Sequence, residues 1–171
     1  MLGILDQIEG AKNAGLYYVA LLSALAVPDI AGAIDAQNGR ATRSAYAKWF
    51  DTHLGPKYQA SWGQALLGAD CYHFRCSMLH QGTAVLQHSK AGFSQLLFVE
   101  PSTSRVTMHK NIINGALNID VNIFCQDIVD AGRAWHRAAS GTPLYGINAA
   151  KCVARHPDGL APYIVGIPCI G

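Results

Sequence analysis

Residues 14–27 read AGLYYVALLSALAV, and this apolar stretch decides which kind of fold the chain can adopt. Apolar side chains cover nearly every face of a helix drawn through it, which is typical of a helix at the centre of a bundle or at an interface. Pro28 follows and is expected to interrupt the helix, with a second helical piece at 29–36. The apolar run ends at Pro28 and is shorter than the roughly 20 residues that cross a membrane. We therefore expect a helical bundle and no membrane span.

A second helix is expected at 41–54 (ATRSAYAKWFDTHL). Tyr46, Phe50 and Leu54 recur at four-residue spacing and form one apolar stripe along it. The helix is expected to end at the Gly-Pro pair that follows.

Two longer helices are expected at 61–81 and 121–139. In the first, Ser61 is the expected N-cap and Gly82 the residue that ends the helix. Its main positions step by threes and fours: Trp62, Leu66, Ala69, Tyr72 or His73, Cys76 and Leu79. In the second, Asp120 is the expected N-cap. The inner stripe of that helix consists of Phe124, Ile128, Ala131 and Trp135.

Between these two helices the sequence changes character. Residues 93–100 and 105–113 are rich in β-forming side chains, and the polar residues 101–104 separate them, which predicts a β-hairpin. Residues 142–171 contain four of the prolines and are expected to form an extended tail over the surface. The predicted fold is therefore mainly α: an up-down helical bundle with a hairpin inserted at about 93–113, in a single domain over 1–171.

Composition limits the classes of function. Half of the 171 residues are hydrophobic, 14% are charged and the formal net charge is +2, which excludes a disordered chain and neither requires nor excludes nucleic acid as a partner. Glycine-rich phosphate loops, nucleophile elbows and paired catalytic carboxylates are absent from the sequence.

The cysteines favour a reducing compartment. An odd number of widely spaced cysteines with no CxxC pair argues against a disulfide framework and for the cytoplasm. The five are Cys71, Cys76, Cys125, Cys152 and Cys169. A secretion signal is the alternative, because residues 22–26 resemble a cleavage site, but Asp6 and Glu9 precede the apolar run where a signal peptide carries positive charge.

Residues 71–82, CYHFRCSMLHQG, concentrate titratable groups at the end of one predicted helix. Arg75 and His80 are five residues apart, about 140° around a helix, so only the long arginine side chain can bring the two groups together. A histidine can exchange the proton of a ribose 2′-hydroxyl or of a leaving oxygen near neutral pH, and an arginine can hold a phosphate. Ser77 is a candidate for positioning the phosphate or a water molecule.

The sequence RCSMLH from Arg75 to His80 resembles the R-x4-6-H motif of the HEPN superfamily. The resemblance implies a small helical bundle, a metal-independent ribonuclease without a cofactor, and a homodimer in which both chains line one cleft. It also implies a role in toxin–antitoxin or antiviral systems, with RNA and an antitoxin as partners. In these terms His80 is the catalytic acid or base, Arg75 holds the phosphate, and Ser77, His73 and Cys76 support them.

Three alternatives remain open for this segment. Active family members commonly carry a polar residue after the arginine where this chain has Cys76, so one alternative is a non-catalytic HEPN-like module that binds RNA, a nucleotide or a protein. In a second, His80 stabilises only the end of its helix and Arg75 pairs with an acid such as Asp70. In a third, His73, Cys76 and His80 share a helical face and bind zinc. The fourth zinc ligand would then come from His109, Cys125 or His136.

Overall fold

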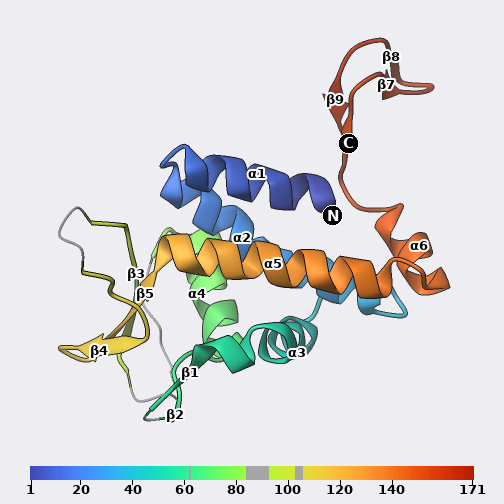
Figure 1. Ribbon diagram of the computed structural model, residues 1–171. Coiled ribbons are helices and arrows are strands. Elements are labelled where there is room, and N and C mark those ends of the chain that lie inside the picture. The colour runs from blue at the N-terminus through green and yellow to red at the C-terminus, as the bar shows by residue number, and fades with distance from the viewer. Residues whose placement is uncertain (62, 84–92, 103–105) are drawn as a thin grey trace.

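The computed structural model describes residues 1–61, 63–83, 93–102 and 106–171, and these residues form a mainly helical protein (Figure 1). The helices are α1 (Leu2–Asn13), α2 (Tyr17–Asp35), α3 (Arg43–His53), the short 3-10 helix η1 (Gly55–Tyr58), α4 (Gly68–Gln81), α5 (Val121–Ala139) and α6 (Pro143–Ala149). The strands are β1 (Gln59–Ala60), β2 (Gly63–Gln64), β3 (Gln95–Val99), β4 (Asn111–Ile113), β5 (Ala116–Asp120), β6 (Arg155–His156), β7 (Gly159–Leu160), β8 (Ile164–Val165) and β9 (Cys169–Ile170). The predicted mainly α class is confirmed.

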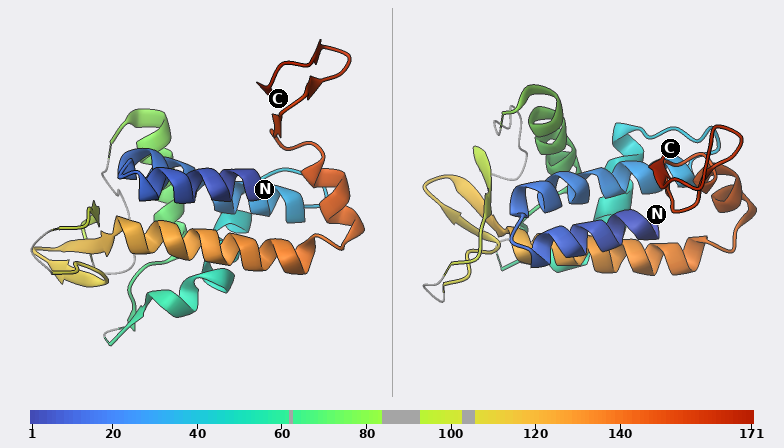
Figure 2. Two further views of the ribbon diagram at one scale, coloured as in Figure 1. Left: turned by 45° about the horizontal axis from the view of Figure 1, so that its top comes forward. Right: turned by 90° about the horizontal axis from the view of Figure 1, so that it is seen from above.

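Helix α2 lies at the centre of the helical part, as its apolar sequence predicts. It contacts α1, α3, α4, α5 and α6. Figure 2 shows α1, α2 and α5 running side by side along the length of the molecule. One side of the first turn of α2 stays exposed, at Tyr18 and Val19.

The predicted interruption of this helix at Pro28 is wrong. Helix α2 continues through Pro28 to Asp35. Proline removes one backbone donor from a helix, and here the Tyr46 hydroxyl on α3 donates to the Leu25 carbonyl at 3.0 Å, within the turn before the proline. The continuous helix has 19 residues and is long and apolar enough to cross a membrane by length and composition alone, so the prediction that it is too short is also wrong. Half of it is buried inside the protein.

Helix α1 was not expected from the sequence. Leu5 and Ile8 on one face of α1 are fully buried. On the neighbouring face, Arg133 of α5 forms ion pairs with Asp6 at 2.8 Å and with Glu9 at 2.9 Å. Apolar packing and these ion pairs together hold α1 along α5.

Helices α3 and α5 agree with the sequence. Helix α5 spans Val121–Ala139, and the Asp120 carboxylate accepts the Ile123 N–H at 2.9 Å, as expected for its N-cap. Helix α3 lies within the predicted 41–54 and is capped by Thr42. Both predicted stripes are buried in one core: Tyr46, Phe50, Leu54, Phe124, Ile128, Ala131 and Trp135.

Helix α4 begins seven residues later than predicted, and Ser61 does not cap it. It starts at Gly68, and the preceding residues form the β1–β2 hairpin instead. Gly63 has φ = 119°, a conformation outside the helical region, so a helix cannot pass through it. The predicted apolar position Trp62 lies outside the described residues. The end of the helix is as predicted, because Gly82 adopts the left-handed conformation with φ = 64°.

The start of α4 packs tightly on the backbone of α3. A Cβ atom added at Gly68 would lie 2.6 Å from the Ala47 carbonyl oxygen and 2.7 Å from its Cα atom. We therefore expect Gly68→Ala to lower the free energy of unfolding by about 2–3 kcal/mol, because the two helices must move apart. In Gly10→Ala the added methyl group meets nothing within 4 Å, and this control should raise the free energy of unfolding by about 0.5–1 kcal/mol. Urea unfolding of both variants measures the difference, and equal effects would contradict the close packing.

The predicted hairpin between 93–100 and 105–113 is wrong in its pairing. Strand β3 pairs in parallel with β5, and β4 pairs antiparallel with β5, so β5 is central in the order β3-β5-β4. The tight turn is Asn114-Gly115, with φ values of 50° and 77°, between Ile113 and Ala116. Residues 103–105, where part of the predicted turn falls, lie outside the described residues.

The predicted tail at 142–171 is extended only after its first residues. Thr142 caps the short helix α6, which packs on α2. Beyond α6, β6 pairs with β9 and β7 pairs with β8. This segment does not lie flat on the helices as predicted: it projects from the end of the bundle near the start of α1 (Figures 1 and 2).

Candidate functional site

Arg75 and His80 lie next to each other at the end of α4. The Nη1 atom of Arg75 is 3.4 Å from Nε2 of His80. The arginine side chain therefore crosses the gap that the five-residue spacing leaves around the helix. The guanidinium has only donors, so a hydrogen bond between the two groups requires Nε2 of His80 to act as the acceptor.

Asp29 on α2 holds the arginine in place. Its carboxylate is 2.6 Å from Nη2 of Arg75. Only 20% of the Arg75 side chain and 15% of the Asp29 side chain are exposed, so the pair is largely shielded from water. The expected pairing of Arg75 with an acid is thus confirmed, and the partner is Asp29 where Asp70 was named as an example. The three groups form a chain from the bundle centre to the surface, with His80 at its exposed end.

Asp29 was missed in the sequence, although a signal for it exists. It is the only charged residue between Tyr17 and Ile34 in the most apolar helix of the chain. A carboxylate in such a helix needs a partner when it is buried. That rule predicts a basic partner without saying which one.

The ion pair changes the proton affinity of both partners. Burial raises the pKa of the Asp29 carboxyl above its usual value, and the attraction of Arg75 only partly opposes this. Burial acts to lower the pKa of Arg75, but the Asp29 carboxylate and Cys76 outweigh it and the net shift is upward. The arginine therefore stays charged, and acid neutralises the pair by protonating Asp29 at a higher pH than an ordinary aspartate requires.

The three predicted supporting residues take different places. The Cys76 Sγ atom lies 3.7 Å from Nη1 of Arg75, so Cys76 belongs to the site. Ser77 closes the helix end, where its backbone carbonyl accepts the N–H groups of Gly82 and Thr83. His73 is about 200° around the helix from Arg75 and packs against the Tyr72 ring, with 6.2 Å between ring centroids.

Tyr72 is a further member of the site that the sequence analysis did not single out. The Cζ atom of Arg75 lies 6.0 Å from the centre of the Tyr72 ring, at the outer limit of a cation–π contact. Its edge also meets the Tyr46 ring of α3, at 5.4 Å between centroids. The tyrosine therefore limits the positions open to the arginine side chain.

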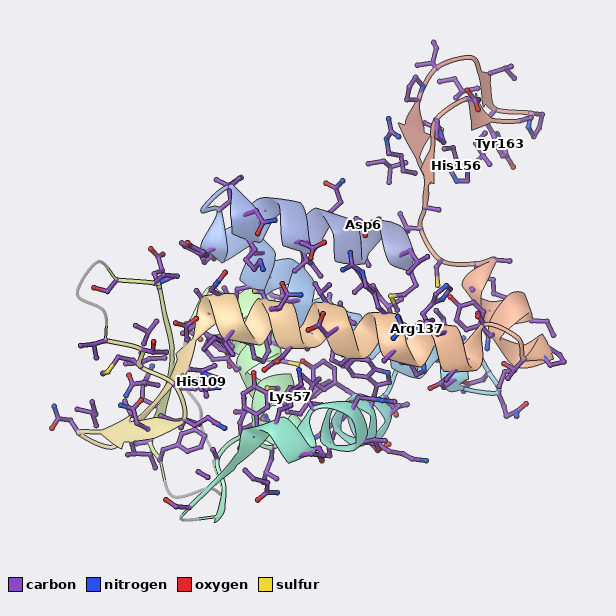
Figure 3. All side chains as sticks on the ribbon, viewed as in Figure 1. Asp6, Lys57, His109, Arg137, His156 and Tyr163 are labelled. Atoms are coloured by element: carbon purple, nitrogen blue, oxygen red, sulfur yellow. The ribbon has the colours of Figure 1, made fainter. Side chains whose placement is uncertain are left out.

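The donors considered for zinc have separate surroundings. His109, labelled in Figure 3, packs on the Tyr58 ring, and Nδ1 of His136 is 2.7 Å from the Tyr145 hydroxyl. Burial raises the pKa of the Cys125 thiol to about 12. Across residues 1–61, 63–83, 93–102 and 106–171, no group of three or more His, Cys, Asp or Glu side chains is arranged to hold a metal ion.

Two other histidines make the stability of the fold sensitive to acid. Burial is the main cause that lowers the pKa of His53 and of His109. An unfolded histidine titrates near 6.5, so below about this pH the unfolded chain binds more protons than the folded one. The free energy of unfolding should therefore fall as the pH drops below about 6.5.

The double variant His53→Gln/His109→Gln tests this origin of the acid sensitivity. Urea unfolding at several pH values should show a flatter dependence between pH 5 and 7 than the unaltered protein shows. An unchanged slope would assign the acid sensitivity to other groups. The comparison also separates loss of fold from a direct effect of pH on activity.

Comparisons with protein-family models, with curated proteins and with solved structures found no match for this chain.

Proposed function

We propose that this protein is a HEPN-like, metal-independent endoribonuclease in which Arg75 and His80 are the catalytic pair. The observation that carries the proposal is the 3.4 Å contact between Nη1 of Arg75 and Nε2 of His80. It supports the expectation that the two ends of the R-x4-H motif act together. The bundle of α1–α5, in which α4 ends on the motif, is the HEPN-like core of this proposal.

The proposed reaction is attack of a ribose 2′-hydroxyl on the adjacent phosphate. When the phosphate binds, Nη1 of Arg75 turns from His80 to the phosphate, Nε2 of His80 takes the proton of the hydroxyl, and the 2′-oxygen forms a bond to phosphorus. Arg75 stabilises the charge that develops on the phosphate oxygens. The 5′-oxygen leaves with a proton, which leaves a 2′,3′-cyclic phosphate on one product and a 5′-hydroxyl on the other.

Asp29 limits how the arginine meets the phosphate. Its carboxylate already pairs with Nη2, so the Nη1 edge next to His80 is the side that faces a substrate. His80 is exposed, which suits a polymer that binds across a surface. A surface site also leaves the second wall of a cleft to a partner chain.

A homodimer supplies that second wall in our proposal. The apolar start of α2 is the surface that supports it, with Leu16, Tyr18 and Val19 exposed by 56%, 64% and 51%. Two copies of the Arg75–His80 pair would then face one phosphate, one histidine as base and the other as acid.

We expect Tyr18→Glu to separate the dimer and to reduce cleavage at least 100-fold while the subunits stay folded. The dimer should separate because burying a charged glutamate in an apolar contact requires removing its water, which is unfavourable. Cleavage should fall because a monomer holds only half of the proposed site. Light scattering measures the oligomeric state, and circular dichroism checks the fold. Ile147→Glu on α6, at a side chain exposed by 60%, is the matched control and should leave both unchanged. A Tyr18→Glu monomer with full activity would contradict the shared site.

The products test the reaction itself. We expect cleavage of single-stranded or loop RNA to give 2′,3′-cyclic phosphate and 5′-hydroxyl ends by mass spectrometry. A substrate with a 2′-deoxyribose at the cleaved position should not be cleaved, because the attacking 2′-oxygen is missing. Products with 5′-phosphate ends would contradict the mechanism.

A non-catalytic module that binds RNA, a nucleotide or a protein partner is the second candidate. Two features of the site favour it: Cys76 stands where active relatives carry a polar residue, and Asp29 occupies part of the arginine fork. It predicts RNA binding without products.

A toxin or defence role in the cytoplasm fits either form of the proposal. The cytoplasmic location in this proposal is supported by the five cysteines, which all lie within the described residues and are all free thiols.

A further inference from the structure

A pocket of about 830 Å³ lies between the helical bundle and the C-terminal segment, and Asp29, the partner of Arg75, is one of the residues that line it. Four parts of the chain enclose it: the start of α1, the second half of α2, the loop at 39–41, and the chain from the end of α6 into β6 and β9. Figures 1 and 2 show this C-terminal segment beside the start of α1.

The walls of the pocket are mostly apolar. Ile4 from α1, Ile30 and Ala33 from α2, and Val153 and Ile170 from the C-terminal segment all line it. Its volume lies within the roughly 300–1,000 Å³ that is usual for small-molecule sites, which are apolar cavities with a few polar groups. A ligand for this pocket therefore has a substantial apolar part.

The charged groups of the pocket differ in whether they already have a partner of opposite charge. Asp29 lines it, but its carboxylate is already neutralised by Arg75. Lys151 and Arg155 also line it, and within the part of the chain that the structure describes neither forms an ion pair with a carboxylate. The Lys151 ammonium instead donates to the Asn148 side chain at 3.2 Å. Two cations thus remain to attract an anion.

We propose that this pocket binds an amphipathic anion, an alkyl chain that ends in a carboxylate. The chain lies against the apolar walls, and the carboxylate faces Lys151 and Arg155. A cationic ligand fits less well, because the one acidic group of the pocket already has its partner in Arg75. This inference does not depend on RNA cleavage, since its test measures binding alone.

Titration calorimetry with octanoate, decanoate and dodecanoate, below their micelle concentrations, tests the proposal. Each methylene that enters the apolar pocket should tighten binding about fourfold (~0.8 kcal/mol) until the pocket is filled. Dodecanol and dodecylamine are the neutral and cationic controls and should bind at least fivefold more weakly than dodecanoate. Absence of dodecanoate binding, or equal binding of all three head groups, would overturn the proposal.

Variants locate the site. Lys151→Gln and Arg155→Gln should each weaken dodecanoate binding about fivefold (~1 kcal/mol), as expected for one partly exposed charge pair. Lys48→Gln removes the same charge from an exposed position on α3 outside the pocket and should leave the affinity unchanged. Ala33→Trp should abolish binding by filling the cavity. If Ala33→Trp does not fold, Lys151→Gln and Arg155→Gln still test where dodecanoate binds. If these two variants bind dodecanoate as tightly as Lys48→Gln does, the assignment of the pocket is overturned.

Discussion

Replacing His80 by alanine is expected to reduce RNA cleavage by about 10²–10⁴-fold, because the group that accepts the proton of the 2′-hydroxyl is lost. Replacing Arg75 by alanine should cost about 10²–10³-fold, the usual effect of removing one group that stabilises transition-state charge. Both losses should appear in kcat more than in KM, since these contacts strengthen as the reaction proceeds. Single-turnover cleavage of one labelled RNA measures them.

Arg75→Lys separates charge from geometry at the same position. A lysine can still pair with Asp29, but its single ammonium cannot reach the carboxylate and the phosphate at once as the guanidinium fork does. We expect Arg75→Lys to keep the fold and to lose most of the activity. The matched control is His73→Gln on another face of the same helix, which should change cleavage less than threefold. A variant of His73 as damaging as one of His80 would contradict the assignment of roles.

Asp29→Asn is expected to lower both the stability of the protein and its rate of RNA cleavage. It keeps the shape of the side chain but leaves the largely buried Arg75 without a counter-charge. We expect the free energy of unfolding to fall by about 2–3 kcal/mol, at the low end for loss of one partner of a buried pair, because both side chains retain some exposure. Cleavage should fall about 100-fold as well, since the arginine loses the contact that fixes its position.

The control for this variant is Asp130→Asn on the exposed side of α5, where the carboxylate accepts from Gln126 at 2.9 Å. Its free energy of unfolding should change by less than about 0.5 kcal/mol. The double variant Asp29→Leu/Arg75→Met replaces both charges by apolar groups and should recover most of the stability without recovering activity. If the double variant is as unstable as Asp29→Asn, the ion pair is not the cause of the loss.

The elements that the sequence predicts correctly are those with local signals. Helix α5 has an N-cap in Asp120 and a regular apolar stripe, and both are seen in the structure. Gly82 ends α4 because a residue without a side chain can adopt the left-handed conformation. These features depend on residues within a few positions of each other.

The elements predicted wrongly depend on distant partners. Strand β3 pairs with β5, although β4 comes between them in the sequence. A pattern rich in β-forming residues does not say which strands pair. Asn114-Gly115 is a local signal for the β4–β5 hairpin. The polar residues 101–104 give a competing turn signal, and the predicted hairpin has its turn there instead. The central helix continues through Pro28, and it packs against five other helices, of which α4, α5 and α6 come from distant parts of the chain.

The candidate site follows the same division. The proximity of Arg75 and His80 could be predicted, since one helix end carries both. Asp29 could not be assigned as their partner, because the packing of α2 against α4 decides which acid meets the arginine. The sequence therefore indicates the proposed pair, Arg75 and His80, and the fold supplies the acid that contacts the arginine.

The most direct test of the proposed centre is RNA cleavage in the presence of EDTA by the unaltered protein, Arg75→Ala and His80→Ala, at matched fold and oligomeric state. Our account predicts cleavage by the unaltered protein alone, because the reaction needs both side chains and no metal. Cleavage by all three proteins, or cleavage that EDTA abolishes, would contradict it. Tight RNA binding with no cleavage by any of them would instead support the non-catalytic module.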